Sequence, residues 1–318
     1  MSVPHDATGA SDDAGRRARA AAPLVLLVNA AAGTGLAPRR LGALLARHPA
    51  VRARATVVAT PSLDHFRRAV DAVAPDAIPV AVGGDGSLNA LLAHLAAHGD
   101  PRRVVGVVPF GTGNATAATL GLRSPDLALR ALALGTVRAL DVMRTDHPRA
   151  PLALVSCSAG FEAAFLARYG AVRYRSRQWA GWSALLGNLP RRWRDVSFTA
   201  DDVALVRPGD PVHNAGGYVI PTYAYGRVLW PGLAADDGRA IAAVARDVAA
   251  YWTLIARGAP LPPPGVVAST FGVRTRAWVR AVIESPSGVQ VDGESLGPAR
   301  IALTVAPSLA RVVGLATR

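Results

Sequence analysis

The chain alternates between short apolar runs and longer stretches whose apolar positions recur at helical spacing, and this pattern is clearest before residue 137. Apolar runs of about four to eight residues are typical of buried strands, and apolar positions three and four apart are typical of helices. Their alternation predicts a parallel sheet with helices on both faces. The predicted strands are 24–28, 53–59, 78–82 and 104–108, and the predicted helices are 38–48, 63–73, 88–98 and 115–120.

One further helix is marked by residues at both of its ends. Serine is a favoured N-cap, so Ser124 indicates the start, and Pro125 suits the first helical position. Asp126 then places a negative charge near the positive end of the helix dipole. Gly135 follows the last apolar position, where glycine commonly ends a helix. The α/β pattern therefore ends close to residue 136.

From about residue 137 the pattern changes to short β-like runs separated by proline, glycine and aspartate, which predicts a β-rich second domain. We interpret the apolar helix pattern at 247–256 as packing only. Residues 1–21 show no apolar period, and we expect them to be a disordered tail. The β-like runs are 152–156, 218–220, 278–283 and 301–305.

The composition excludes several kinds of chemistry. All 35 lysine and arginine residues are arginine, so the chain has no lysine. Walker A kinases, protein kinases and Schiff-base enzymes each need a lysine in the active site, so these three classes are excluded. The formal charge of +13 favours a polyanionic partner, but no nucleic-acid-binding motif accompanies it. The one cysteine, Cys157, fits a reducing, cytoplasmic compartment and is interpreted as a small buried residue. No apolar run reaches the length of a membrane-spanning helix, about 20 residues, so a soluble or peripheral protein is expected.

Two glycine-rich turns carry the strongest chemical signal. Residues 83–87 read Gly-Gly-Asp-Gly-Ser after the strand 78–82, and residues 109–114 read Pro-Phe-Gly-Thr-Gly-Asn after the strand 104–108. Each turn opens a helix, so backbone N–H groups and the positive end of a helix dipole converge there. Ligands of parallel α/β sheets bind at the carboxyl ends of the strands, which is where both turns lie. The sequence therefore predicts a phosphate site, with the Asp85 carboxylate inside it to hold a metal or take a proton.

These two motifs and two others resemble, in the same order, those of the diacylglycerol kinase catalytic domain family, which includes bacterial lipid kinases and sphingosine kinases. The other two are Asn29 with Gly-Thr-Gly at 33–35, and Val-Asp-Gly-Glu at 291–294. The resemblance spans residues 24 to about 313. It implies an α/β ATP-binding domain at 22–136, completed by 307–318, and a β-sandwich lipid-binding domain at 137–306.

The resemblance also implies roles for individual residues. Thr60 matches a threonine at the ATP site, and the glycine turns would surround the phosphates. Asp236 and Asp237 match an acidic turn that binds a structural Mg²⁺, and carboxylate oxygens suit that ion. The residues implied to bind ATP are Asn29, Gly33, Gly35, Thr60, Gly83, Gly84, Gly86, Ser87, Gly111, Thr112, Gly113 and Asn114.

The implied reaction is transfer of the γ-phosphate of ATP to the hydroxyl of a diacylglycerol-like or long-chain-base lipid, with Mg²⁺ and arginines offsetting the charge. Asp85, Asp292 and Glu294 are the implied catalytic acids. The family's Asp-Gly-Glu acids accept the proton, so we favour Glu294 as the base, and Asp292 and Asp85 stay open as alternatives. A positioned base contributes roughly 10²- to 10⁴-fold to the rate.

Two other functions stay open. Ala90 stands where the family usually has glutamate, which motivates a catalytically weak nucleotide- and membrane-binding protein. An NAD kinase shares the Gly-Gly-Asp-Gly turn, although the second turn argues against it. Neither the acceptor lipid nor the oligomeric state is fixed by the sequence, and a homodimer stays open.

Two further patterns in the sequence suggest a membrane surface and a metal site. Residues 168–194 hold seven arginines and five aromatic residues with no acid, a composition that favours an anionic membrane surface at the inner face of the membrane, or else a solvated basic face. His94 and His98 are four apart on one predicted helix, a spacing that can bind a metal. The sequence shows no third ligand nearby, so we interpret the two histidines as part of a surface face.

Overall fold

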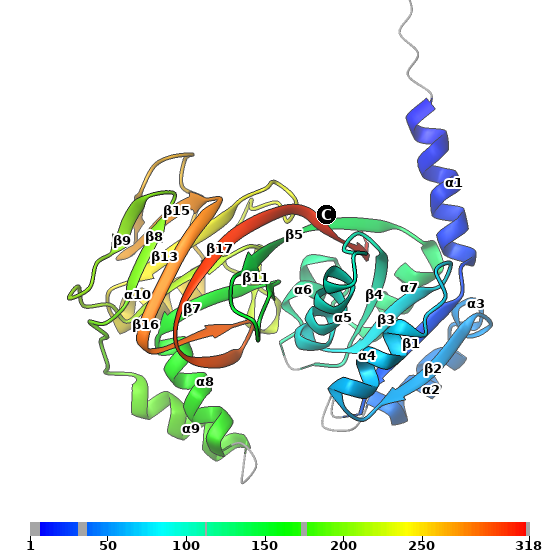
Figure 1. Ribbon diagram of the computed structural model, residues 1–318, viewed down its shortest axis with the longest axis horizontal. Helices are drawn as coiled ribbons and strands as arrows, with labels where there is room; N and C mark the ends of the chain where they lie inside the picture. Colours follow the sequence, from blue (N-terminus) through cyan, green and yellow to red (C-terminus); the bar gives the residue numbers. More distant parts are fainter. Residues whose placement is uncertain (1–6, 31–36, 112, 173–176, 316–318) are drawn as a thin grey trace, which may run out of the picture. The chain divides into compact units, whose positions relative to one another are not determined.

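The structure is a computed structural model that describes residues 7–30, 37–111, 113–172 and 177–315 (Figure 1). The chain divides into two compact units, which are described separately. The first unit comprises Met1–Leu140, Ala224–Gly226 and Leu309–Arg318, and the second comprises Asp141–Tyr223 and Arg227–Ser308.

The first unit contains the parallel sheet that the sequence predicts. Its strands pair in the order β2-β1-β3-β4, all parallel, and β3 is buried along its whole length. The end of strand β17 joins the sheet beside β4, with Arg311 opposite Val104. The four strands are β1 (Leu24–Asn29), β2 (Ala55–Thr60), β3 (Ile78–Gly83) and β4 (Val104–Pro109).

Two helices of the first unit begin at a serine that caps them. The Ser124 hydroxyl accepts the backbone N–H of Leu127, and Gly135 ends that helix in the left-handed conformation, as predicted. Ser62 caps a second helix in the same way. The helices after β1 are α2 (Ala37–Ala46), α3 (Pro49–Arg52), α4 (Leu63–Asp71), α5 (Asp85–Ala97), α6 (Ala115–Thr119) and α7 (Pro125–Leu134).

The structure corrects the expectation of a disordered tail at residues 1–21. Helix α1 (Ala7–Ala21) occupies most of that segment (Figure 1). Its residues are mainly alanine and arginine, which favour helices even without an apolar period. The Arg19 guanidinium donates to the carbonyl of Gly135 at 3.0 Å. A Cβ on Gly135 would lie 2.4 Å from the carbonyl oxygen of Arg16. Helix α1 therefore packs so closely on Gly135 that no side chain would fit at that position.

The second unit is strand-rich, as predicted, and its main sheet is antiparallel. Its strands pair in the order β14-β15-β13-β10-β7-β16-β17, and β8 and β9 extend it from β16. The strands are β5 (Val137–Thr145), β6 (Leu152–Ala153), β7 (Ser156–Gly160), β8 (Ser197–Ala200), β9 (Val203–Val206), β10 (Asn214–Tyr218), β11 (Thr222–Tyr223), β12 (Arg227–Val228), β13 (Ala240–Ala245), β14 (Ala268–Thr270), β15 (Val273–Trp278), β16 (Arg280–Val291) and β17 (Glu294–Val313), of which β5 and β17 contribute to both units.

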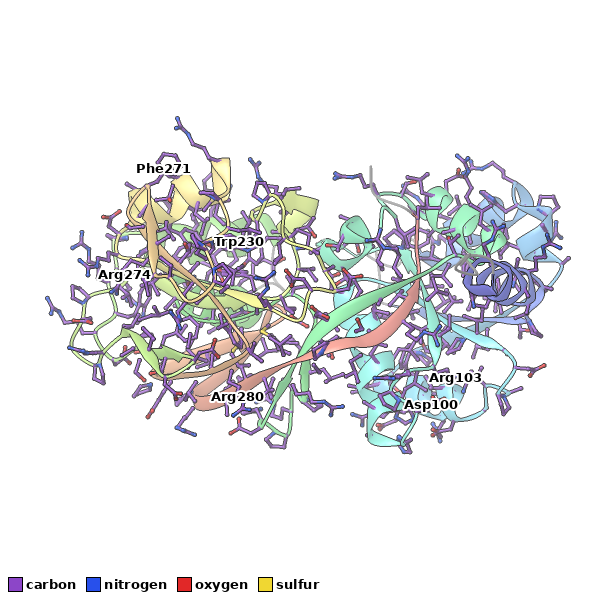
Figure 2. All side chains as sticks on the ribbon, turned by 90° about the horizontal axis from the view of Figure 1, so that it is seen from above. Asp100, Arg103, Trp230, Phe271, Arg274 and Arg280 are labelled. Atoms are coloured by element: carbon purple, nitrogen blue, oxygen red, sulfur yellow. The ribbon has the colours of Figure 1, made fainter. Side chains whose placement is uncertain are left out.

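Helices and aromatic side chains complete the second unit. Trp230 is fully buried, whereas Phe271 is 53% exposed (both labelled in Figure 2). The Arg257 guanidinium lies 5.7 Å from the centroid of the Phe271 ring. Cys157 is fully buried, as expected, and burial raises the pKa of its thiol above the ordinary range.

None of the helices in the described residues combines the length and the apolar character that a membrane span requires. The helices are α8 (Phe161–Val172), α9 (Arg177–Asn188) and α10 (Val248–Arg257), with the 3₁₀ turn η2 (Ala224–Gly226) in the first unit.

A buried carboxylate organises the interior of the second unit. Glu162 accepts hydrogen bonds from the hydroxyls of Ser158, Tyr218 and Tyr251 at 2.5–3.1 Å. Its backbone N–H donates to the side chain of Asn214 at 3.0 Å. Burial, followed by the nearby Glu162 charge, raises the pKa values of both tyrosines well above their usual range. The tyrosines therefore stay protonated and keep donating to the carboxylate.

Candidate functional site

The two predicted glycine turns lie against each other in the first unit. The carbonyl of Gly83 accepts the backbone N–H groups of Phe110 and Gly111 at 2.7 and 3.1 Å. A Cβ on Gly111 would lie 2.3 Å from the Cα of Gly84, closer than two carbons can approach without bonding. Glycine is therefore required because one backbone packs directly on the other.

The first turn also brings β1 and the start of α5 together. The Asn29 side chain donates to the hydroxyl of Ser87 at 3.1 Å, and a Cβ on Gly83 would lie 2.2 Å from that hydroxyl oxygen. Helix α5 begins at Asp85 with Gly84 as its N-cap, so the first N–H groups of α5 are available to a ligand. Thr60 is buried, and its hydroxyl donates to the carbonyl of Val28 on β1 at 2.9 Å.

The structure shows what the Asp85 carboxylate binds. Its two oxygens accept the backbone N–H groups of Ala115 and Thr116 at 2.8 and 2.9 Å, at the start of α6. Asn114 precedes them in the left-handed conformation and donates to the carbonyl of Gly111 at 2.6 Å. A Cβ on Gly113 would lie 3.3 Å from the same carboxylate. Asp85 thus links the two turns, because both of its carboxylate oxygens accept N–H groups that follow the second turn.

The Asp-Gly-Glu motif forms the tip of the β16–β17 hairpin. Val291 pairs with Glu294, and the two residues between them have positive φ values, 48° for Asp292 and 89° for Gly293. Two-residue hairpin loops favour Asp-Gly because both positions need this conformation. The side chain of Gln290 accepts the N–H of Gly293 at 2.8 Å and fixes the turn.

The two acids of this motif differ in their contacts. The oxygens of Asp292 accept the backbone N–H groups of Leu154, Val155 and Ser156 at 2.7–3.0 Å, so Asp292 holds that loop to the hairpin. Glu294 is exposed, and its carboxylate makes no hydrogen bond or ion pair to any residue that the structure describes. Of the three predicted acids, Glu294 therefore has a carboxylate that stays available to accept a proton.

The predicted metal residues lie on a turn that a further acid holds. Asp141 is 1% exposed, and its carboxylate accepts the N–H groups of Gly238 and Ser308 at 2.6 and 2.7 Å. Burial raises the pKa of Asp141, and the charges of Asp237 and Asp236 raise it further against the effect of these hydrogen bonds. Asp141 was not predicted, although a single charge within the apolar run at 140–143 is a signal of a buried acid.

The donors at this turn fit Mg²⁺, which protein sites commonly bind through one or two carboxylates and several waters. Asp236 is exposed, whereas Asp237 forms a 3.2 Å ion pair with Arg239. An ion shared by both acids would therefore compete with that guanidinium. Gly33, Gly35 and Thr112, which were predicted to bind the nucleotide, lie outside the described residues.

Comparison with known proteins supports the resemblance. Residues 23–145 match the family model of the diacylglycerol kinase catalytic domain. A search of curated proteins finds no match. A protein of Bacillus anthracis str. Sterne provisionally described as a diacylglycerol kinase has a similar structure, with a TM-score of 0.67 and 18% identity over 92% of this chain and 97% of the other. The predicted family resemblance is thereby confirmed.

Two further solved structures are similar over most of the chain. A diacylglycerol kinase from the same organism gives a TM-score of 0.64 at 17% identity, over 92% of this chain and 97% of the other. An NAD kinase from Archaeoglobus fulgidus in complex with ATP gives 0.44 at 13% identity, over 91% and 93%. At these identities the likeness to the Bacillus structures establishes the fold alone.

Proposed function

We propose that this chain is an ATP-dependent lipid kinase that transfers the γ-phosphate of ATP to the hydroxyl of a diacylglycerol-like or long-chain-base lipid. Residues 23–145 match the diacylglycerol kinase catalytic domain. The observation that carries the proposal is the pair of glycine turns joined through Gly84, Gly111 and Asp85 within that domain. Such backbone-lined turns at helix N-termini suit a polyphosphate.

In this mechanism the chain mainly positions charge. The backbone N–H groups at the start of α5 would donate to phosphate oxygens, and Asp85 would keep the second turn beside the first. Phosphoryl transfer relies on positioning and electrostatic stabilisation more than on covalent steps by the protein. Because the chain has no lysine, arginine side chains would supply the positive charge. Asp236 and Asp237 would hold a structural Mg²⁺. A Mg²⁺ ion that accompanies ATP would offset the phosphate charge.

Glu294 would accept the proton of the lipid hydroxyl. Its carboxylate is exposed and has no partner in the described part of the chain. Asp292 accepts three backbone N–H groups, so protonating it would disturb the loop it holds. Glu294 can take up a proton without such a loss.

Helix α9 would bring the protein to an anionic membrane surface. Trp182 and Leu186 are both 64% exposed and lie four residues apart, so they share one face of α9. Arg191, Arg192 and Arg194 follow the helix, and each cation near an anionic surface contributes about 1 kcal/mol. We expect Trp182→Ser with Leu186→Ser to reduce sedimentation with phosphatidylserine vesicles, and unchanged sedimentation would contradict this role.

The decisive experiment supplies radiolabelled ATP and Mg²⁺ with a panel of diacylglycerol, a long-chain base and NAD. We expect label in a lipid product. Label in NAD would replace the proposal with an NAD kinase activity. Binding of ATP without transfer to any acceptor would favour the catalytically weak alternative. In that case Ala90→Glu tests whether the glutamate usual in the family restores transfer.

A further inference from the structure

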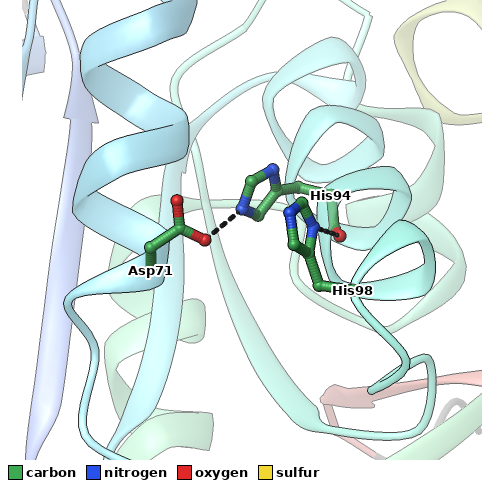
Figure 3. A group of neighbouring side chains, drawn as sticks. All are labelled: Asp71, His94 and His98. Carbon is green, nitrogen blue, oxygen red and sulfur yellow. Dashed lines mark hydrogen bonds and ion pairs between the residues drawn. The ribbon is translucent and has the colours of Figure 1, made fainter.

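A cluster of three metal-ligating side chains lies in the first unit, outside the nucleotide site (Figure 3). Asp71 is the last residue of α4, His94 lies in the last turn of α5, and His98 follows that helix. Their ligand atoms all lie within 4.8 Å of one another. In the described residues this is the one group of three or more histidine, cysteine or acidic side chains this close together. The structure thus supplies the third ligand that the sequence did not show.

A hydrogen bond to the backbone sets which tautomer the neutral His98 ring adopts. Its Nδ1 lies 2.8 Å from the carbonyl oxygen of His94. A carbonyl can only accept, so Nδ1 carries the hydrogen and the Nε2 of the neutral ring keeps its lone pair. Metal-binding histidines commonly donate their other ring N–H to such an acceptor, which fixes the ring for ligation. His98 is therefore in the tautomer that ligates a metal through Nε2.

The other two side chains already meet. His94 Nε2 lies 2.6 Å from an oxygen of Asp71, so an imidazole and a carboxylate are already in contact. The His94 side chain is 8% exposed, while Asp71 is 54% exposed. Packing therefore holds the His94 side chain in place, whereas Asp71 and His98 are open to solvent, so an ion can reach the three side chains.

The surroundings favour a cation. Helices α4 and α5 both end at this cluster, and the C-terminal end of a helix carries partial negative charge. The two imidazole rings lie with their centroids 4.1 Å apart, and one ligand atom from each of the three side chains lies within 4.8 Å of the other two. Protein ligands bind Zn²⁺ at about 2.0–2.2 Å, which places ligand atoms of one tetrahedral ion about 3.4 Å apart.

We propose that Asp71, His94 and His98 form a binding site for a divalent transition metal of the zinc class, completed by water. Two imidazole nitrogens select against Mg²⁺ and Ca²⁺, which prefer oxygen ligands, and favour Zn²⁺, Co²⁺ or Ni²⁺. On binding, the hydrogen on His94 Nε2 passes through water to Nδ1 of the same ring, which frees the Nε2 lone pair. His94 and Asp71 then both coordinate the ion in place of their hydrogen bond. The ion would then tie the end of α4 to the end of α5.

The test uses the full-length chain without a histidine tag, freed of metal with EDTA. Titration with Co²⁺ reports ligand geometry through its visible absorption, and calorimetry with Zn²⁺ gives stoichiometry and affinity. We expect one equivalent to bind, with nitrogen-ligand absorption bands, and a higher melting temperature with Zn²⁺. Asp71→Asn and His98→Gln should each weaken Zn²⁺ binding by about tenfold or more, since the loss of even an outer-shell partner of a metal ligand typically costs roughly 10- to 100-fold in affinity.

The matched control is His65→Gln. His65 is an exposed histidine on α4 that bonds to Ser62, so its loss removes an imidazole from the same helix without touching the cluster. This variant should bind Zn²⁺ like the unaltered chain.

Circular dichroism checks that each variant is folded. The His98 side chain is exposed, so we expect His98→Gln to fold like the unaltered chain. Unchanged Zn²⁺ affinity in both Asp71→Asn and His98→Gln, or no uptake of Co²⁺ by the unaltered chain, would overturn the proposal. Neither readout depends on kinase activity.

Discussion

At the residue scale, the three carboxylates predicted as catalytic acids differ in what their oxygens already bind. Asp85 accepts two backbone N–H groups and Asp292 accepts three, whereas Glu294 accepts none from the described residues. Family resemblance favoured Glu294 as the base, but the sequence could not show this difference in contacts, because the partners lie far away along the chain. Ala115 is 30 residues from Asp85, and Leu154 is 138 residues from Asp292.

This difference predicts opposite behaviour in two conservative variants. Glu294→Gln should lower kcat by roughly 10²- to 10⁴-fold, the usual contribution of a general base, and leave ATP affinity and melting temperature unchanged. Steady-state kinetics, ATP calorimetry and thermal unfolding measure the three effects. Asp292→Asn is the comparison: its amide replaces one accepting oxygen by a donor, so the melting temperature should fall. Full activity of Glu294→Gln would remove Glu294 as the base.

His213 gives a prediction for the dependence of stability on pH. It is 1% exposed, its ring stacks on Phe161, and its Nδ1 lies 3.0 Å from the carbonyl of Arg191. Burial lowers its pKa below the ordinary value of 6.5, so the folded chain keeps the ring neutral while the unfolded chain takes up a proton near pH 6.5. The contribution of His213 is therefore present above pH 6.5 and lost as the pH falls below it.

Denaturant unfolding between pH 8 and 5 measures this contribution. The free energy of unfolding should decrease by up to about 1.4 kcal/mol per pH unit below 6.5. In His213→Gln this part of the decrease should be missing. Parallel pH profiles of the two proteins would show that His213 is not the titrating group.

At the scale of elements, a phosphate bound at the start of α5 and a side chain placed on Gly86 would compete for the same space. Gly86 lies in the first turn of α5, and a Cβ built there meets nothing within 4 Å. Gly42 on α2 is equally unobstructed and lies on a different helix. Alanine stabilises a helix by roughly 0.5–1 kcal/mol relative to glycine, so both substitutions should keep or raise stability.

Only Gly86→Ala should weaken ATP binding, because its methyl group would enter the space beside the first N–H groups of α5. Calorimetry with ATP and thermal unfolding of Gly86→Ala and Gly42→Ala separate the two effects. If Gly86→Ala binds ATP as tightly as Gly42→Ala, the nucleotide does not approach this turn.

Elements with local signals were predictable from the sequence. Strand β3 was expected at 78–82 and is found at Ile78–Gly83, and the cap residues Ser124 and Gly135 fixed α7. Helix α1 was missed because its contacts lie in tertiary packing against Gly135 rather than in an apolar period. Most strands of the second unit are short, and their pairing is set by contacts between distant parts of the chain. The four apolar runs in the sequence therefore indicated a β-rich domain but not the order of its strands in the sheet.

At the scale of the whole molecule, the last residues of the chain complete the first unit. Arg311 and Val312 pair with Val104 and Val105 on β4, and the N–H of Leu315 donates to the carbonyl of Leu120 at 2.9 Å. These contacts join segments about two hundred residues apart. The return of the chain to its first domain was expected from family resemblance, since no local pattern encodes it.

The pairing predicts that the first unit cannot keep its stability without the end of the chain. Val312 and Val313 are 0% and 1% exposed, and burying each such side chain contributes about 1.5–3 kcal/mol. A chain ending at Ser308 would lose both, together with the edge that β17 provides for β4, a loss comparable to the whole stability of many domains. We therefore expect this truncation to lose ATP binding and show faster hydrogen exchange in β3 and β4. A chain lacking only residues 316–318 serves as the control, and equal protection of β4 in the two proteins would contradict the prediction.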